Sequence, residues 1–192
     1  MKHDFLIVAA LREESKGRFE ALRQPVLYTG VGKINATMSL MGYLSTLDLK
    51  KRPKAIINLG TAGSFIFPFG QIYQVKIFFQ SDMLCEPLAK KYCTPFDPRG
   101  GYIDMKYFTE RYQAVDCGSG DHFVRSASEF SLFDMEGYAL AKVCERFVIP
   151  FISLKCISDS GLTADWNANL EVCSEKLAKA GKGLIQDLRK MF

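Results

Sequence analysis

The sequence contains few of the residues that bind metal ions. Only two of its 192 residues are histidines, His3 and His122, and its six cysteines form no Cys-x-x-Cys pair. Structural zinc sites are usually built from closely spaced cysteine and histidine ligands. We therefore predict no metal site and expect no cofactor.

A disulfide framework is also poorly supported. Cys144 lies in an apolar helical pattern and Cys156 in an apolar strand pattern. Cysteines in such positions behave as small buried hydrophobic residues, and reduced thiols are typical of intracellular proteins. We expect reduced cysteines and a cytoplasmic location.

No apolar run approaches the roughly 20 residues that span a bilayer. The N-terminus superficially resembles a signal peptide, but its short apolar stretch runs directly into Arg12, Glu13 and Glu14. A cleavage site would need small residues at this point. We interpret the stretch as a first strand and predict no association with membranes.

Charge of one sign is not in large excess, because the formal net charge is only +4. The densest basic cluster consists of Lys50, Lys51, Arg52 and Lys54, between a helical pattern and an apolar run. A nucleic-acid patch is one interpretation of such a cluster. A solvated connection is the other, and we favour it because short charged runs are usually exposed loops. No nucleic-acid partner is therefore predicted.

The composition and length indicate one α/β domain over residues 1–192, since 48% of the residues are hydrophobic. Runs rich in β-branched and aromatic residues predict strands at 5–10, 26–29, 55–59, 72–79 and 151–157. Apolar residues at helical spacing predict helices at 34–47, 135–147 and 170–191. This alternation favours a central mixed, mostly parallel sheet flanked by helices. Residues 81–118 contain several prolines and a Gly-Gly pair, and we predict a surface loop or lid there.

Three of the predicted strands end in unusual polar or glycine-rich segments. These segments are "LREES", "GTAGS" and "SDSG", the last of which carries Asp159. Ligands of open α/β sheets bind at the carboxyl ends of the strands, so the three segments are expected to line one pocket. A half-buried Asp159 at its floor would favour the protonated form and suit a general acid.

Each of these segments also has a purely structural interpretation. The glycines of "GTAGS" are typical of a tight turn, and Glu13 and Glu14 are typical of the first turn of a helix. Asp159 is equally typical of a turn or an N-cap. From these residues alone, a small-ligand enzyme and an ordinary set of turns both remain open.

Six segments together extend the interpretation to a family. They are "VAALREE", "GVGKINA", "NLGTAGS", "CGSGDHFV", "FDMEGYALAKVCERFVIPF" and "ISDSG". In order and rough spacing they resemble the nucleoside phosphorylase and nucleosidase superfamily, most of all its methylthioadenosine/S-adenosylhomocysteine nucleosidase branch. The resemblance spans nearly the whole chain except residues 81–118. It implies a homodimeric enzyme that hydrolyses the N-glycosidic bond of an adenosine-type nucleoside.

The resemblance also implies roles for individual residues. Asp159 matches the acid that protonates the leaving purine, Glu14 the carboxylate that orients water, and Glu136 the one that holds the ribose hydroxyls. It places the other substrate contacts at Met135 beneath the sugar, Phe123 against the base, the Val124 backbone at the base edge, Thr61 beside the acid and the water, and Ser158 next to the acid.

Hydrolysis of an N-glycosidic bond is expected to need two carboxyl groups in different environments. Cleavage of an N-glycosidic bond builds positive charge on the ribose while the base leaves as a poor anion, so a proton donor and a nearby negative charge are needed. We expect Asp134 to be an N-cap and Glu136, in the first helical turn, to stay ionised near the helix dipole. Histidine is a common catalytic base, but we predict that His122 is a bystander.

Two other functions remain open beside hydrolysis. Phosphorylases of the superfamily hold phosphate with arginines, one of which precedes the glycine turn, where this chain has Asn58 and Leu59. Acidic residues such as Glu14 disfavour phosphate, so we predict hydrolysis, whereas Arg12 and Arg125 keep a phosphorylase as an alternative. A catalytically silent nucleoside-binding protein is the third, and the three retained carboxylates argue against it.

The substituent on the 5′ carbon of the substrate is not predicted. Residues 81–118 and 125–133 form shorter segments than in typical members, and Tyr138 replaces a residue that is usually small. Methylthioadenosine, adenosylhomocysteine, deoxyadenosine and a futalosine-like nucleoside are all left open.

Overall fold

The computed structural model describes residues 4–98, 100–126 and 129–192, so His3 lies outside the described residues. Its strands are β1 (Phe5–Ala9), β2 (Val26–Tyr28), β3 (Ala55–Gly63), β4 (Ile72–Gln80), β5 (Tyr102–Asp104), β6 (Ala114–Ser119), β7 (Leu132–Asp134) and β8 (Phe151–Asp159). Its helices are α1 (Arg12–Ser15), α2 (Lys33–Ser45), α3 (Gly137–Phe147) and α4 (Thr163–Met191), with short 3-10 helices at Glu20–Leu22 and Leu49–Lys51.

All the strands join one mixed sheet in the order β2-β1-β3-β7-β6-β4-β5, and β8 pairs with both β3 and β4. β3 runs parallel to β1 and β8, and β6 runs parallel to β4 and β7. β8 meets β4 in the antiparallel direction. The strands β3, β7, β6, β4 and β8 therefore close a circuit, and the predicted mixed sheet flanked by helices is confirmed.

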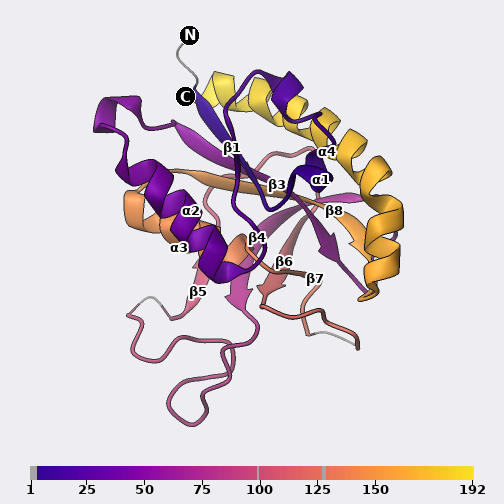
Figure 1. Ribbon diagram of the computed structural model, residues 1–192. Helices are drawn as coiled ribbons and strands as arrows, with labels where there is room; N and C mark the ends of the chain where they lie inside the picture. Colours follow the sequence, from indigo (N-terminus) through magenta and orange to yellow (C-terminus); the bar gives the residue numbers. More distant parts are fainter. Residues whose placement is uncertain (1–3, 99, 127–128) are drawn as a thin grey trace.

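Helices cover the sheet on two sides (Figure 1). On one side α2 and α3 pack together, and Leu40 and Leu140 join a buried cluster with strand residues such as Val8. On the other side α4 buries Leu177 and Leu184 against strand residues that include Ile57. The central strands are thus buried on both faces, which is why they appear in the sequence as continuous apolar runs.

The carboxyl ends of β3 and β8 lie side by side. The register pairs Ala62 with Ile157, and a bulge then brings Gly63 opposite Asp159. Gly63 has no room for a side chain, because a β-carbon there would lie 2.0 Å from the ring of Phe133 in β7. The structure therefore excludes the tight-turn interpretation of "GTAGS" for Gly60 to Gly63, which belong to β3. The missing side chain of Gly63 lets the ring of Phe133 pack there.

Three short strands lie where we predicted none. β5 falls within residues 81–118, β6 begins within them and ends at Ser119, and β7 precedes α3. β6 reads "AVDCGS", whose aspartate, glycine and serine are typical of turns, yet its Val115 and Cys117 are buried. The pairing of β6 between β7 and β4 in the circuit outweighs the low strand propensity of its aspartate, glycine and serine.

The rest of residues 81–118 is irregular, as predicted, but it is tied to α3. The hydroxyl of Tyr138 donates a hydrogen bond to the carbonyl oxygen of Gly101 at 3.0 Å, and Lys142 forms an ion pair with Asp97. The structure describes all six cysteines and joins none of them in a disulfide. Within the described ranges, no helix is both long enough and apolar enough to cross a membrane.

Candidate active site

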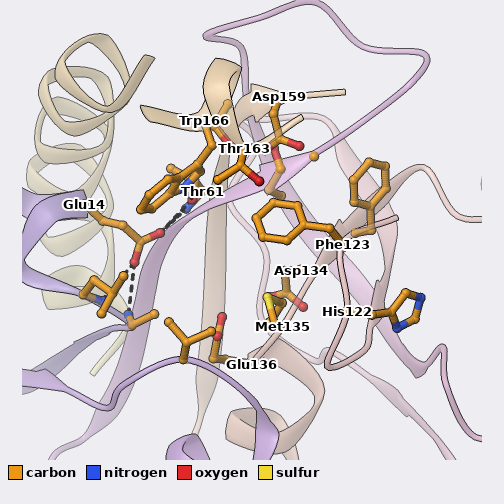
Figure 2. Close-up of a pocket in the computed structure, with 17 residues that line it drawn as sticks. Glu14, Thr61, His122, Phe123, Asp134, Met135, Glu136, Asp159, Thr163 and Trp166 are labelled. Carbon is orange, nitrogen blue, oxygen red and sulfur yellow. Dashed lines mark hydrogen bonds between the residues drawn. The ribbon is translucent and has the colours of Figure 1, made fainter. Parts of the chain in front are cut away.

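One cavity of about 280 Å³ opens where the ends of β1, β3 and β8 meet the loop before α3 and the start of α4. Its lining is mostly apolar, with carboxylates from separate elements (Figure 2). Of the eight predicted site residues, seven line it: Glu14, Thr61, Phe123, Met135, Glu136, Ser158 and Asp159. The parallel strands therefore gather segments that are far apart in the sequence, as predicted.

Glu14 is held by hydrogen bonds to both carboxylate oxygens. Oε2 accepts the backbone N–H groups of Ala10 and Leu11, each at 3.2 Å. Oε1 accepts the backbone N–H of Thr61 at 2.9 Å and its hydroxyl at 2.7 Å. The side chain is only 5% exposed, so α1 delivers a buried, fixed carboxylate to the cavity (Figure 2).

Asp159 is the last residue of β8 and is more deeply buried than the half-buried position we predicted, with 5% of its surface exposed. Its Oδ2 accepts the hydroxyl of Ser158 and its Oδ1 accepts the backbone N–H of Gly161, both at 2.8 Å. The prediction for Asp159 considered only its burial. The structure adds these two donors, which fix the orientation of the carboxyl group.

The position and the pKa of Glu136 differ from what we expected. It occupies the N-cap position of α3 itself, and Asp134 lies two residues earlier, although the Asp134 carboxylate accepts the N–H of Gly137 at 3.0 Å. Burial, and after it the negative charge of Asp134, raises the pKa of Glu136 to about 8. The helix dipole that we expected to keep Glu136 ionised is outweighed by desolvation.

Glu136 also connects two distant segments. Its Oε1 accepts the backbone N–H of Gly32 at 2.8 Å, in the loop before α2. Gly32 has a φ of +92°, which favours glycine, so this residue type fits the turn that presents its N–H to the cavity. The "GVGK" segment is thereby tied to the "DMEG" segment.

The apolar wall includes Met135, Phe123 and Phe133, whereas Val124 is not among the lining residues. The carbonyl oxygen of Val124 instead packs against Gly161, where a β-carbon would lie only 2.1 Å away. The contact of the Val124 backbone with a base edge stays a prediction, and its side chain is not part of the cavity wall. His122 borders the cavity, but its ring is exposed and points away from Glu14 and Asp159 (Figure 2).

The lining also includes residues that we did not predict as site residues, among them Thr163 and Trp166. Both lie in the first turn of α4, which begins seven positions before the helix start we predicted at Leu170. The indole Nε1 of Trp166 donates a hydrogen bond to the Thr61 hydroxyl at 3.1 Å. The sequence signal was a threonine at the first helical position, two residues after "SDSG".

No lysine or arginine is found among the described residues that line the cavity. Arg12 pairs with Glu20 at 3.5 Å and its guanidinium lies over the ring of Tyr28, while Arg125 is exposed. Across the parts of the chain that the structure describes, no group of three or more histidine, cysteine or acidic side chains is arranged to hold a metal ion. The polar chemistry of the cavity is therefore that of carboxylates, hydroxyls and backbone N–H groups.

Comparison with known proteins finds relatives in sequence and in fold. The sequence pattern of the Phosphorylase superfamily matches residues 118–186. The 5′-methylthioadenosine/S-adenosylhomocysteine nucleosidase of Buchnera aphidicola subsp. Acyrthosiphon pisum (strain Tuc7) is 27% identical over 206 aligned residues, which cover 91% of this chain and 85% of that protein.

Solved structures share the fold. The 5′-methylthioadenosine/S-adenosylhomocysteine nucleosidase of Helicobacter pylori, with butyl-thio-DADMe-Immucillin-A, superposes with a TM-score of 0.80 at 19% identity over 97% of this chain and 99% of that one. The futalosine hydrolase of the same organism reaches a TM-score of 0.79 at 20% identity, with the same coverage.

Proposed function

We propose that this chain, which belongs to the phosphorylase superfamily, is a purine nucleosidase that hydrolyses the N-glycosidic bond of an adenosine-type nucleoside. The observation that carries the proposal is that Glu14 and Asp159, from separate ends of the chain, line one cavity with an apolar wall. The expected products are the free base and the corresponding ribose. The nucleosidase relative named above supports the same reaction class.

In this proposal Asp159 donates a proton to the departing purine. Its hydrogen bonds to Ser158 and Gly161 hold the carboxyl group in one orientation toward the cavity. A positioned general acid contributes on the order of 100- to 10,000-fold to a rate. Glu14 orients the attacking water, and its negative charge stabilises the positive charge that develops on the ribose.

Glu136, Met135 and Phe123 bind the substrate. Because the pKa of Glu136 is raised to about 8, its carboxyl group is largely protonated at neutral pH and is able both to donate to and accept from ribose hydroxyls. Met135 and Phe123 supply apolar contacts for the sugar and the base. We assign Val124 to the support of the Phe123 segment, since it packs against Gly161 rather than lining the cavity.

Hydrolysis is favoured over phosphorolysis by charge. The described lining residues include the acidic side chains Glu14, Asp134, Glu136 and Asp159 and no cationic one. A phosphate dianion entering this cavity meets no arginine or lysine to offset its desolvation, whereas a neutral water molecule requires none.

In this proposal the 5′ substituent of the substrate is methylthio- or homocysteinyl-like, as the name of the nucleosidase relative suggests. Tyr138 does not narrow this choice, because its side chain is buried against Gly101 and does not line the cavity. The first turn of α4, with Thr163 and Trp166, and the Phe123 segment border the cavity and are better placed to select the substituent.

The homodimer and the cytoplasmic location belong to the same proposal. Ile34, Met38 and Met41 are 71%, 69% and 39% exposed at helical spacing on α2, a stripe suited to a second copy of the chain. The six free cysteines suit a reducing compartment. Sedimentation of the purified protein would show a single species of about twice the 21.6 kDa chain mass, and a monomer would contradict the dimer.

A panel of purine nucleosides tests the proposed reaction. The purified protein is incubated with methylthioadenosine, adenosylhomocysteine, deoxyadenosine and futalosine, with and without added phosphate, and free base is measured. We expect base release that does not depend on phosphate. Release only with phosphate would indicate a phosphorylase, and tight binding without release would indicate a nucleoside-binding protein.

A further inference from the structure

The indole of Trp166 is linked to Glu14 through a single hydroxyl group. Trp166 Nε1 donates to Thr61 Oγ1 at 3.1 Å, and Thr61 Oγ1 donates to Glu14 Oε1 at 2.7 Å. An indole N–H is a donor only, so the direction of the first bond is fixed. Because the Thr61 oxygen accepts from the indole, its one proton is free to point at Glu14.

The carboxylate of Glu14 has no unused acceptor position in this arrangement. Its two oxygens offer about four lone-pair sites. Four donors contact them, namely the backbone N–H groups of Ala10, Leu11 and Thr61 and the hydroxyl of Thr61. A water molecule that Glu14 is to orient must therefore replace one of these donors.

Only one of the four donors is able to turn away without moving the main chain. Three are backbone N–H groups, two of them just before α1 and one within β3. The Thr61 hydroxyl, in contrast, rotates about a single bond. Its rotation releases one lone pair of Glu14 Oε1, and the indole N–H of Trp166 holds the oxygen in place while the proton moves.

Trp166 is itself held firmly enough to serve this purpose. Its backbone N–H donates to the carbonyl oxygen of Leu162 at 3.2 Å, which places it in the first turn of α4. The side chain of Asn169, one turn later, donates to the carbonyl oxygen of Ser158 at 3.0 Å. The start of α4 is thus tied to the end of β8, next to Asp159.

We propose that Trp166 is a positioning residue that, through the Thr61 hydroxyl, controls when Glu14 accepts the attacking water. The inference rests on the nucleosidase function proposed above. Trp166 also borders the cavity, but the role assigned here belongs to its N–H group and not to its ring.

A double-mutant cycle separates the N–H from the ring. Trp166→Phe keeps an aromatic wall and removes the donor, and we expect kcat to fall about three- to tenfold with little change in KM, the effect of one lost hydrogen bond. Thr61→Val removes the hydroxyl, and Thr61→Ser restores it. In the Thr61→Val background, Trp166→Phe is expected to cause no further loss. Additive losses, or a change confined to KM, would overturn the proposal.

The chain's single tryptophan gives a readout that does not need turnover. Fluorescence excited at the red edge of the indole absorption reports on Trp166 alone. Thr61→Val is expected to shift its emission maximum, whereas Thr46→Val, at the exposed end of α2, is expected to leave it unchanged. Equal emission in all three proteins would overturn the link.

The same measurement distinguishes the two proposals. If the wild-type protein releases no base from any nucleoside but Thr61→Val still shifts the emission, the nucleosidase function fails and the Trp166 to Thr61 link stands. If base is released and the double-mutant cycle is additive, the function stands and the positioning role fails.

Discussion

The ammonium group of Lys155 lies 2.6 Å from Oδ2 of Asp134, and the two side chains are 2% and 1% exposed. Asp134 precedes Met135 and Glu136 at the cavity wall, and Lys155 lies in β8 four residues before Asp159. A β-carbon on Gly60 would lie 3.3 Å from the Lys155 nitrogen and 3.7 Å from Glu14 Oε1. This buried cation is therefore located behind the carboxylates of the site.

Removal of the Lys155 charge is expected to destabilise the protein strongly. Lys155→Met leaves Asp134 as a buried, uncompensated charge, and the free energy of unfolding should fall by about 3–5 kcal/mol. The matched control is Lys51→Met, whose partner Asp48 lies 3.1 Å away but whose side chain is 72% exposed. That change should cost less than about 1 kcal/mol. Urea unfolding measures both, and equal losses would contradict the interpretation.

The stability of the protein should depend on the protonation of Glu136. The pKa of this carboxyl is raised from 4.5 to about 8 in the folded state. Between these values the folded protein holds a proton that the unfolded chain releases, so the stabilisation is complete below pH 4.5 and is lost as the pH rises toward 8. Glu136→Gln should remove this pH dependence.

The measurement is the free energy of unfolding by urea across this pH window. The difference between wild type and Glu136→Gln is expected to change steadily with pH. Glu175→Gln, on the exposed face of α4, should follow the wild-type profile. A constant difference between wild type and Glu136→Gln would show that Glu136 does not titrate in this range.

Gly161 should be intolerant of even one added carbon. It has a φ of +91°, and a β-carbon would lie 2.1 Å from the carbonyl oxygen of Val124. Gly161→Ala should therefore lower the free energy of unfolding by more than about 1 kcal/mol and weaken nucleoside binding, because the displaced segment carries Phe123.

Gly42→Ala is the matched control for Gly161→Ala. Gly42 lies within α2, and nothing lies within 4 Å of the position of an added β-carbon. Alanine should stabilise this helix by about 0.5–1 kcal/mol. Thermal unfolding distinguishes the two, since the melting temperatures should move in opposite directions.

The strands that were predicted from the sequence include those buried on both faces. We predicted strands at 5–10 and 151–157, and the structure places β1 at Phe5–Ala9 and β8 at Phe151–Asp159. Burial on two sides requires continuous apolar runs, which are visible in a sequence. β7 is three residues long, and its pairing with β3 and β6 is a long-range property that no local pattern records.

The site was predicted less completely than the fold. Positions at the ends of apolar strands led to Glu14 and Asp159, because parallel strands bring such ends together. Trp166 was missed because its contact with Thr61 joins residues 105 positions apart in the sequence. The protonation of Glu136 was mispredicted because it depends on burial and on the Asp134 charge, and helix position alone carries neither.

Replacement of Asp159 by asparagine tests the central assignment. The amide has almost the same shape, and its oxygen is able to keep the 2.8 Å hydrogen bond from the Gly161 N–H. The Ser158 hydroxyl is able to turn toward the carbonyl oxygen of Ala62, 3.3 Å away, and to accept from the new amide N–H. The fold should therefore be retained.

An asparagine has no proton to donate to a departing base, so we expect base release by Asp159→Asn to fall on the order of 100- to 10,000-fold. The control is Asp104→Asn, an exposed residue of β5 outside the cavity, which should keep wild-type turnover. Nucleoside binding by Asp159→Asn, measured by calorimetry, should persist, because the contacts of Phe123, Met135 and Glu136 are unchanged. Full turnover by this variant would require another proton donor. Burial raises the pKa of Glu136, which also lines the cavity, so the double variant Asp159→Asn with Glu136→Gln would decide between the two carboxyl groups.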